Sequence, residues 1–307
     1  MLLEDVLEEY KYHCLARNYT KKTMINKRQE YRQLKNYLQQ KREITELESI
    51  TSFDLKSYVR TKQVAGLKAQ SIVSMAKMVK AFFNWCVQEE YLKENPMNKV
   101  ALPKLPKLLL IGLTTKEVVS MMESFNNKDY LEVRNKAIIA MMSDCGLRAM
   151  EIARIKEVDV RETDIKVFGK GNKERIVFIS PALKRILIKY ERIKKQYYKS
   201  RLKHNDNYFL AYQGKSMSTV AVYNLVIEAS KRVNITGKRV SPHMFRHYFA
   251  VQSIMAGIDL YSLSRLLGHS DVSTTQRYLQ TLQDDQLSQK AASSSPLMNM
   301  NKEAMNK

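Results

Sequence analysis

Two histidines, an arginine and a tyrosine lie close together near the carboxyl end of this chain. The sequence reads S-P-H-M-F-R-H-Y-F-A from Ser241, and later L-L-G-H-S-D-V-S-T-T-Q-R-Y up to Tyr278. A guanidinium neutralises phosphate oxygens, imidazoles transfer protons, and a phenol can act as a nucleophile. Each residue alone is more often structural, but their joint spacing indicates a phosphoryl-transfer site. The candidates are His243, Arg246, His269 and Tyr278.

Helices with recognisable ends are expected to position these side chains. Pro242 suits the first position of a helix that Ser241 would cap, and residues three apart share one helical face, as His243 and Arg246 would. Gly268 is typical of a helix end. Thr274 and Thr275 then predict the start of a short helix that carries Tyr278.

A second arginine, Arg148, follows a predicted helix over residues 134–143. Gly146 is a natural terminator of that helix, and Arg148 then stands at the start of the next one. An arginine in an apolar stretch costs free energy unless it is paired. Its partner is either Glu151, in a purely structural pair, or a bound phosphate, or both.

The clearest strand signals flank a glycine-bearing turn. The strands I-K-V-F at 165–168 and R-I-V-F-I at 175–179 enclose G-K-G-N-K, which predicts a β-hairpin. This turn is not a phosphate-binding P-loop, because the G-x-x-x-x-G-K spacing is absent. It places Lys170 at the tip of the hairpin. Exposed lysines are usually inert, so the turn alone assigns Lys170 no role.

The net charge points to a polyanionic partner. Lys and Arg total 52 against 31 Asp and Glu, which gives a formal charge of +21. This excess is well beyond the roughly 2–8 charges that solubility requires. Neutralising phosphates releases counterions and adds salt-sensitive affinity, so nucleic acid is favoured over a merely solubilising surface.

The cysteines and the apolar runs exclude other classes. Cys14, Cys86 and Cys145 form no C-x-x-C pair, so neither a disulfide framework nor a zinc knuckle is indicated. No apolar run approaches the ~20 residues that span a bilayer. The amino terminus is acidic and does not resemble a secretory signal. We therefore expect a cytoplasmic protein with no membrane partner.

Helical periodicity predicts the amino-terminal domain, residues 1–102. Its clearest segment runs from Ser71 to Cys86, with an apolar stripe that we interpret as core. Thr20 is a predicted helix cap, and Thr51 with Asp54 forms a predicted capping box.

The second domain is predicted to begin after a basic linker. Residues 103–112 begin P-K-L-P-K, and two prolines among lysines cannot continue a helix. Thr114 and Glu117 form a predicted capping box near the start of a domain over residues 113–290. Residues 291–307 are weakly apolar and are predicted to be a disordered tail.

Together these motifs resemble the tyrosine recombinase family, which includes phage integrases and Xer-type site-specific recombinases. The matching segments are G-L-R at 146–148, G-K-G-N-K-E-R at 169–175, H-M-F-R-H at 243–247, L-G-H at 267–269, and Tyr278. They occur in the family's order, and the likeness covers nearly the whole chain. A simple Xer-like or transposon-borne recombinase is the nearer match. Met150 departs from the pattern, since the family usually has a small residue before the glutamate.

The resemblance implies a mainly α fold with a small β-hairpin. A helical core-binding domain and a mixed α/β catalytic domain would form a clamp around DNA. Strands would be cleaved and rejoined through a 3′-phosphotyrosyl intermediate and a Holliday junction. The implied roles are as follows: Tyr278 is the nucleophile, Arg148 and Arg246 bind the non-bridging oxygens, Lys170 protonates the leaving 5′-oxygen, His243 moves the tyrosine proton, and His269 hydrogen-bonds the phosphate.

No cofactor or metal is expected. Two arginines and a lysine can stabilise the phosphate charge, and the sequence lacks the clustered carboxylates that hold Mg²⁺. His243 and His247 have the i, i+4 spacing of metal ligands, but no H-E-x-x-H glutamate accompanies them. We interpret His247 as a packing or supporting residue.

The expected partner is double-stranded DNA with inverted-repeat sites, bound by a homotetramer, with room for accessory proteins. The segment after Tyr278, with Leu279, Leu282 and Leu287, would dock on a neighbouring protomer or else is an ordinary amphipathic tail. Two alternative functions stay open. One is a sequence-specific DNA-binding protein whose chemistry is silent, and the other is a type IB-like topoisomerase.

Overall fold

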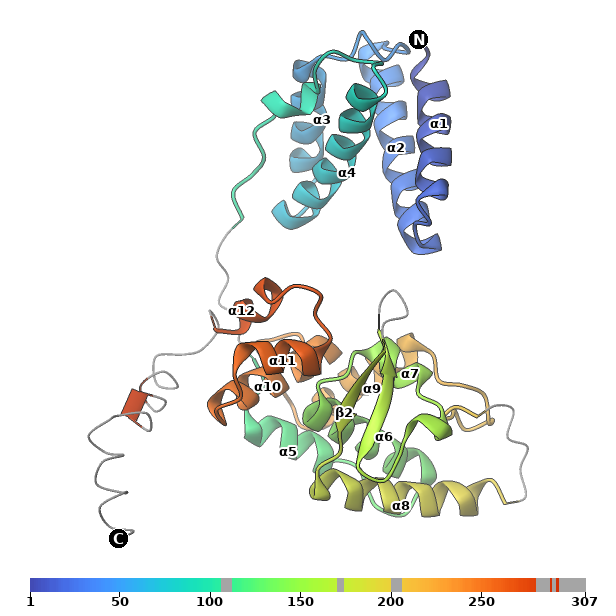
Figure 1. Cartoon of the computed structure of the whole chain (residues 1–307), viewed down its shortest axis with the longest axis vertical. Coiled ribbons are helices and arrows are strands. Elements are labelled where there is room, and N and C mark those ends of the chain that lie inside the picture. The colour runs from blue at the N-terminus through green and yellow to red at the C-terminus, as the bar shows by residue number, and fades with distance from the viewer. Residues whose placement is uncertain (106–111, 170–173, 200–205, 280–287, 289–290, 293–307) are drawn as a thin grey trace. The chain divides into compact units, whose positions relative to one another are not determined.

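The computed structural model describes residues 1–105, 112–169, 174–199, 206–279, 288 and 291–292. The chain divides into two compact units, Met1–Leu108 and Leu109–Lys307, each with its own hydrophobic core. The described structure is mainly helical, with one antiparallel pair of strands (Figure 1). The prediction of a mainly α chain with a small β-hairpin is confirmed. Within the described residues, every helix is too short or too polar to cross a membrane.

In residues 1–105 the first unit is a bundle of α-helices whose ends follow the predicted caps. The Thr20 hydroxyl accepts from the Thr23 amide at 3.2 Å, and Thr51 and Asp54 form the capping box. The elements are α1 (Leu3–Ala16), α2 (Lys21–Arg42), α3 (Ser52–Val64), α4 (Ala69–Gln88) and the 3-10 helix η1 (Pro96–Lys99). The apolar stripe of α4 is buried, as the sequence predicts.

One cation is buried inside this bundle. Lys27 is 8% exposed, and its Nζ donates to the hydroxyls of Tyr10 at 3.0 Å and Tyr31 at 3.1 Å. The same ammonium lies 4.8 Å from the ring centroid of Tyr10 and 5.5 Å from those of Tyr19 and Tyr31. Burial lowers the pKa of Lys27. No pattern in the sequence had predicted this tyrosine cage.

The second unit places helices around a central helix, α6, that packs against both α8 and α10. Its β-strands pair antiparallel, with Lys166 opposite Ile176. The described elements are α5 (Thr115–Glu123), α6 (Tyr130–Cys145), α7 (Ala149–Arg154), the 3-10 helix η2 (Glu157–Asp159), β1 (Asp164–Phe168), β2 (Glu174–Phe178), α8 (Pro181–Tyr197), α9 (Thr219–Arg232), α10 (Pro242–Met255), α11 (Leu260–Leu267) and α12 (Ser273–Leu279). Figure 1 shows α10, α11 and α12 gathered together.

Most predicted helix ends of this unit are confirmed. Thr114 forms its capping box with Glu117, and Gly146 is the C-cap of α6. Ser241 lies at the N-cap of α10, but its side chain makes no capping hydrogen bond, so that part of the prediction is wrong. Pro242 supplies the helix start there, because its fixed φ suits the first helical position.

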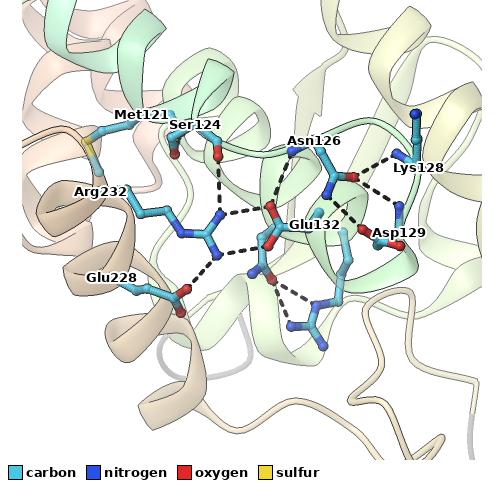
Figure 2. A network of polar contacts seen from close by, with 10 residues as sticks. Met121, Ser124, Asn126, Lys128, Asp129, Glu132, Glu228 and Arg232 are labelled. Atoms are coloured by element: carbon cyan, nitrogen blue, oxygen red, sulfur yellow. Dashed lines mark hydrogen bonds and ion pairs between the residues drawn. The ribbon is translucent and has the colours of Figure 1, made fainter.

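A polar network joins three scaffold helices in Figure 2. The Arg232 guanidinium donates to both Glu132 carboxylate oxygens, at 2.8 and 2.9 Å, to Glu228 at 2.7 Å, and to the Ser124 carbonyl at 3.2 Å. Bidentate pairing of this kind fixes both position and orientation. The network therefore ties α9 to α6 and to the end of α5, and it includes none of the predicted site residues.

Candidate active site

Arg246 joins three separate segments of the second unit. It is 2% exposed on α10, and its guanidinium donates to the carbonyls of Gly146 at 2.8 Å and Leu267 at 2.5 Å. Its Nη2 also lies 2.9 Å from His269 Nε2. Burial, followed by the charge of the nearby Arg148, lowers the pKa of Arg246 to about 10. The side chain is therefore protonated at neutral pH, and none of these three hydrogen-bond partners carries a negative charge.

The two glycine helix ends are required for this arrangement. Gly146 ends α6 at φ 61° and Gly268 ends α11 at φ 66°, in the left-handed region that favours glycine. A Cβ on Gly146 would collide with the Phe249 ring, and one on Gly268 would lie 2.8 Å from Arg175 Cδ. Both helices therefore end where Arg246 can reach their last carbonyls.

Glu151 holds two arginines at the same site. Its carboxylate accepts from Arg148 Nη1 at 2.8 Å and from the Arg148 amide at 2.9 Å. It also accepts hydrogen bonds from Arg175 Nη1 at 2.9 Å and Nη2 at 2.8 Å. The Nε of Arg175 donates to the Leu266 carbonyl at 2.8 Å. Glu151 is thus the protein partner of Arg148, as one reading of the sequence expected.

The charge balance of this network is positive. Burial alone would raise the pKa of Glu151, but hydrogen bonds and charge from Arg175, followed by those from Arg148, lower it to about 2. The carboxylate is therefore ionised at neutral pH. A single negative charge then faces Arg148 and Arg175, with Arg246 close enough to perturb the same groups. Such a cluster favours an incoming anion.

Met150 does not disturb the turn that carries Arg148. It is partly buried on α7, and Arg148 still occupies the N-cap with its amide bonded to Glu151. The departure from the family's usual small residue therefore leaves the local backbone geometry in place.

The two predicted site histidines are neutral at physiological pH. Burial, together with the charges of Arg246, Arg148 and Arg175, lowers the pKa of His269 to about 4. His243 remains largely exposed, yet partial burial and then Arg246 and Arg148 lower its pKa as well. A neutral imidazole can accept a proton, so both are suited to proton transfer.

Tyr278 lies beside two imidazoles. Its ring centroid is 6.2 Å from that of His269 with the planes 17° apart, and 5.5 Å from that of His247 with the planes 72° apart. The Nδ1 of His269 lies 2.9 Å from the hydroxyl of Thr275, which is fully buried on the same helix α12 as Tyr278. The tyrosine helix is therefore connected to the arginine cluster through His269.

Most of the predicted site residues come together in the second unit. Hydrogen bonds, ring contacts and mutual electrostatic effects connect Arg148, His243, Arg246, His269 and Tyr278. Lys170 lies outside the described residues. Arg175 ends the G-K-G-N-K-E-R motif but had no predicted role, and Thr275 was predicted only as part of a helix start and not as the partner of His269.

Comparison with known proteins agrees with this geometry. Residues 112–284 match the model of the phage integrase family, and residues 7–90 match the phage integrase N-terminal SAM-like domain. Tyrosine recombinase XerC of Rickettsia prowazekii (strain Madrid E) is 31% identical over 290 residues, covering 91% of this chain and 93% of that protein. Tyrosine recombinase XerD of Proteus mirabilis is 30% identical over 235 residues, covering 75% and 74%.

Solved structures share the fold at lower sequence identity. A lambda integrase (75–356) dimer bound to a COC′ core site has a TM-score of 0.74 at 18% identity, covering 92% of this chain and 97% of that one. XerH recombinase bound to a palindromic difH substrate has a TM-score of 0.72 at 20% identity, covering 94% and 83%. With two matched family models and relatives of this length, the chain belongs to the phage integrase family of tyrosine recombinases, enzymes that cleave and rejoin DNA.

Proposed function

We propose that this recombinase acts on double-stranded DNA at inverted-repeat sites, with Tyr278 as its nucleophile. The observation that carries the proposal is the buried positive cluster beside the tyrosine, in which Arg246 is hydrogen-bonded to two carbonyls and an imidazole. The phenol oxygen would attack the scissile phosphorus. A 3′-phosphotyrosyl bond would form as the bond to the 5′-oxygen breaks, and the reverse attack by a 5′-hydroxyl would rejoin the strand.

The arginines are proposed to bind the non-bridging phosphate oxygens. A phosphodiester gains charge on these oxygens in the transition state, and preorganised donors stabilise that charge without rearranging. Glu151 holds Arg148 from the side chain and the backbone, and two carbonyls hold Arg246. Both guanidinium groups are therefore supported before DNA arrives, which favours the proposal.

Three further residues are proposed to handle protons and hydrogen bonds. His243, with its lowered pKa, would take the tyrosine proton and return it when the strand is rejoined. His269 would hydrogen-bond the phosphate beside Arg246. Lys170 would protonate the leaving 5′-oxygen. This last role depends on the family resemblance alone, since Lys170 lies outside the described residues.

The proposed assembly is a homotetramer on two DNA sites that proceeds through a Holliday junction. The solved relatives are bound to a core site or a palindromic substrate, and the charge of +21 suits a DNA partner. We propose residues 1–102 as the core-binding domain, 103–112 as the linker, 113–290 as the catalytic domain and 291–307 as a tail, with the two domains clamping the duplex. Accessory proteins and a cytoplasmic location belong to the same proposal. The segment over residues 280–287, proposed to dock on a neighbour, lies outside the described residues.

The first experiment is to trap and sequence the covalently bound DNA. A duplex of the recovered site, nicked just beyond the cleavage position, then loses the short fragment that carries the new 5′-hydroxyl, so rejoining is prevented and the enzyme stays attached to the 3′-phosphate. We expect a covalent complex with the wild type and none with Tyr278→Phe, while both bind the duplex equally. Binding without a covalent complex would instead indicate the silent DNA-binding protein. Relaxation of a supercoiled plasmid without joining to a second duplex would indicate the topoisomerase.

A further inference from the structure

His247 lies between the start of the second unit and the proposed nucleophile. It follows Arg246 on α10, and burial lowers its pKa, so the imidazole is neutral at physiological pH. On one side its ring faces the backbone of Gly112. On the other side it meets the ring of Tyr278. No role in the proposed chemistry is assigned to His247.

The Gly112 side leaves little room for a side chain. A Cβ on Gly112 would lie 3.0 Å from His247 Nδ1 and 3.2 Å from its Cε1, so any larger residue must push the imidazole away. The backbone there is anchored, because Lys238 Nζ donates to the Gly112 carbonyl at 2.7 Å and also pairs with Glu117 at 2.7 Å. The His247 imidazole therefore packs against a stretch of backbone that is held in place at Gly112.

The Tyr278 side is a contact between two ring planes. The His247 and Tyr278 planes are 72° apart, whereas the His269 and Tyr278 planes are only 17° apart. Two imidazoles at such different angles restrict both the position and the tilt of the phenol. Arg246 and Thr275 hold His269 in place, and the backbone at Gly112 supports His247.

We propose that His247 is a positioning residue that aligns Tyr278 for attack, and that Gly112 is needed so that the imidazole can occupy this place. The inference depends on the proposed role of Tyr278 as nucleophile. A displacement of about 1 Å at a reacting group can slow a reaction by about 10²-fold. His247 would therefore affect the rate of cleavage and leave the affinity for DNA unchanged.

The test is a double-variant cycle read by single-turnover cleavage of the nicked duplex at saturating enzyme. We expect His247→Ala to slow cleavage about 10- to 100-fold and Gly112→Ala to slow it about 10-fold, because the nucleophile is misplaced in both. The duplex affinity should stay within about threefold in each. Gly112→Ala should add nothing in the His247→Ala background, since the imidazole that its methyl would strike is gone. His247→Phe, which keeps a flat ring against Tyr278, should recover much of the lost rate.

A matched glycine control separates alignment from general destabilisation. Gly257 has φ +96° with nothing within 4 Å of an added Cβ, so Gly257→Ala strains the backbone in open space. It should cleave at the wild-type rate. The inference is overturned if His247→Ala cleaves like the wild type, if the two variants multiply their effects, or if affinity falls in step with the rate. A wild type that forms no covalent complex would overturn the proposed function as well.

Discussion

Among the described residues, each unit of this protein buries one cationic side chain that makes no hydrogen bond to a carboxylate. The two units stabilise this buried charge in different ways. Lys27 in the first unit is enclosed by tyrosine rings and two tyrosine hydroxyls. Arg246 in the second unit donates to two carbonyls and an imidazole, and neighbouring arginines add to its field. An aromatic face attracts a cation electrostatically, so the cage compensates Lys27 internally. Carbonyl groups orient the Arg246 guanidinium but leave its charge available.

The difference separates a cation that belongs to the core from one that is prepared for a ligand. Burying a charge is costly unless something compensates it. Around Lys27 the rings provide that compensation when no ligand is bound. Around Arg246 the total charge stays positive, because Glu151 is shared between Arg148 and Arg175. We infer that a DNA phosphate completes the second site, whereas the first needs no ligand.

The largest expected effect comes from removing Arg246. Arg246→Ala should reduce single-turnover cleavage of the nicked duplex by about 10²–10³-fold or more, because one preorganised donor pair to the phosphate is lost. Arg246→Lys keeps a positive charge but lacks the planar guanidinium, so its cleavage rate should lie between those of the wild type and Arg246→Ala. Binding to the duplex, measured by gel shift, should change little for both variants.

An arginine outside the site provides the control for this prediction. Arg232 is held by Glu132 and Glu228 in the network of Figure 2, and Arg232→Ala should cleave at the wild-type rate. Loss of duplex binding in Arg246→Ala would argue for a structural role. In that case Arg246 would resemble Lys27, and the comparison would fail.

A change at Glu151 should alter both stability and its pH dependence. Glu151→Gln leaves two guanidinium groups without their carboxylate, which typically costs about 3–5 kcal/mol of unfolding free energy. The pKa of Glu151 is about 2 in the folded protein, below the ~4.3 of a free glutamate. The carboxylate therefore contributes its full stability above about pH 4.3, and this contribution is lost as the pH falls towards about 2.

Urea unfolding of the wild type and Glu151→Gln across this range is the measurement. The difference between their unfolding free energies should be constant above about pH 5 and shrink as the pH falls towards about 2. A difference that does not depend on pH would mean that charge compensation is not what Glu151 contributes.

The smallest effect is expected at Lys27. Lys27→Met keeps much of the side-chain volume but removes the cation and leaves the Tyr10 and Tyr31 hydroxyls without that donor, so we expect a loss of about 1–2 kcal/mol in unfolding free energy. Cleavage at saturating DNA should not change. Lys11→Met is the matched control: this lysine pairs with the exposed Glu8 and lies over the exposed Tyr12 ring, so the change should alter stability by less than about 0.5 kcal/mol. If Lys27→Met abolished cleavage, Lys27 would belong with the ligand-binding cations.

Local patterns were sufficient to predict several features of this protein. The Thr20, Thr51 and Thr114 caps, the glycine end of α6 and the hairpin all arise from interactions within a few residues. The spacing of His243, Arg246, His269 and Tyr278 could be read in the same way, because helix ends bring them close along a short stretch. Ser241 lies at the predicted N-cap, but its side chain makes no capping hydrogen bond, since a residue type favoured at a position need not form the bond. The domain limits and the tetramer stay predictions.

The sequence by itself determined the helical class, the caps and the residue types of the site, since each depends on neighbours along the chain. Only the tertiary structure decided which distant groups meet. The pairing of Glu151 with Arg175, the enclosure of Lys27 by Tyr10 and the close approach of Gly112 to His247 join residues from separate elements. Such pairs depend on how whole helices pack and on which buried charges find compensation, and no short spacing in the sequence encodes that outcome.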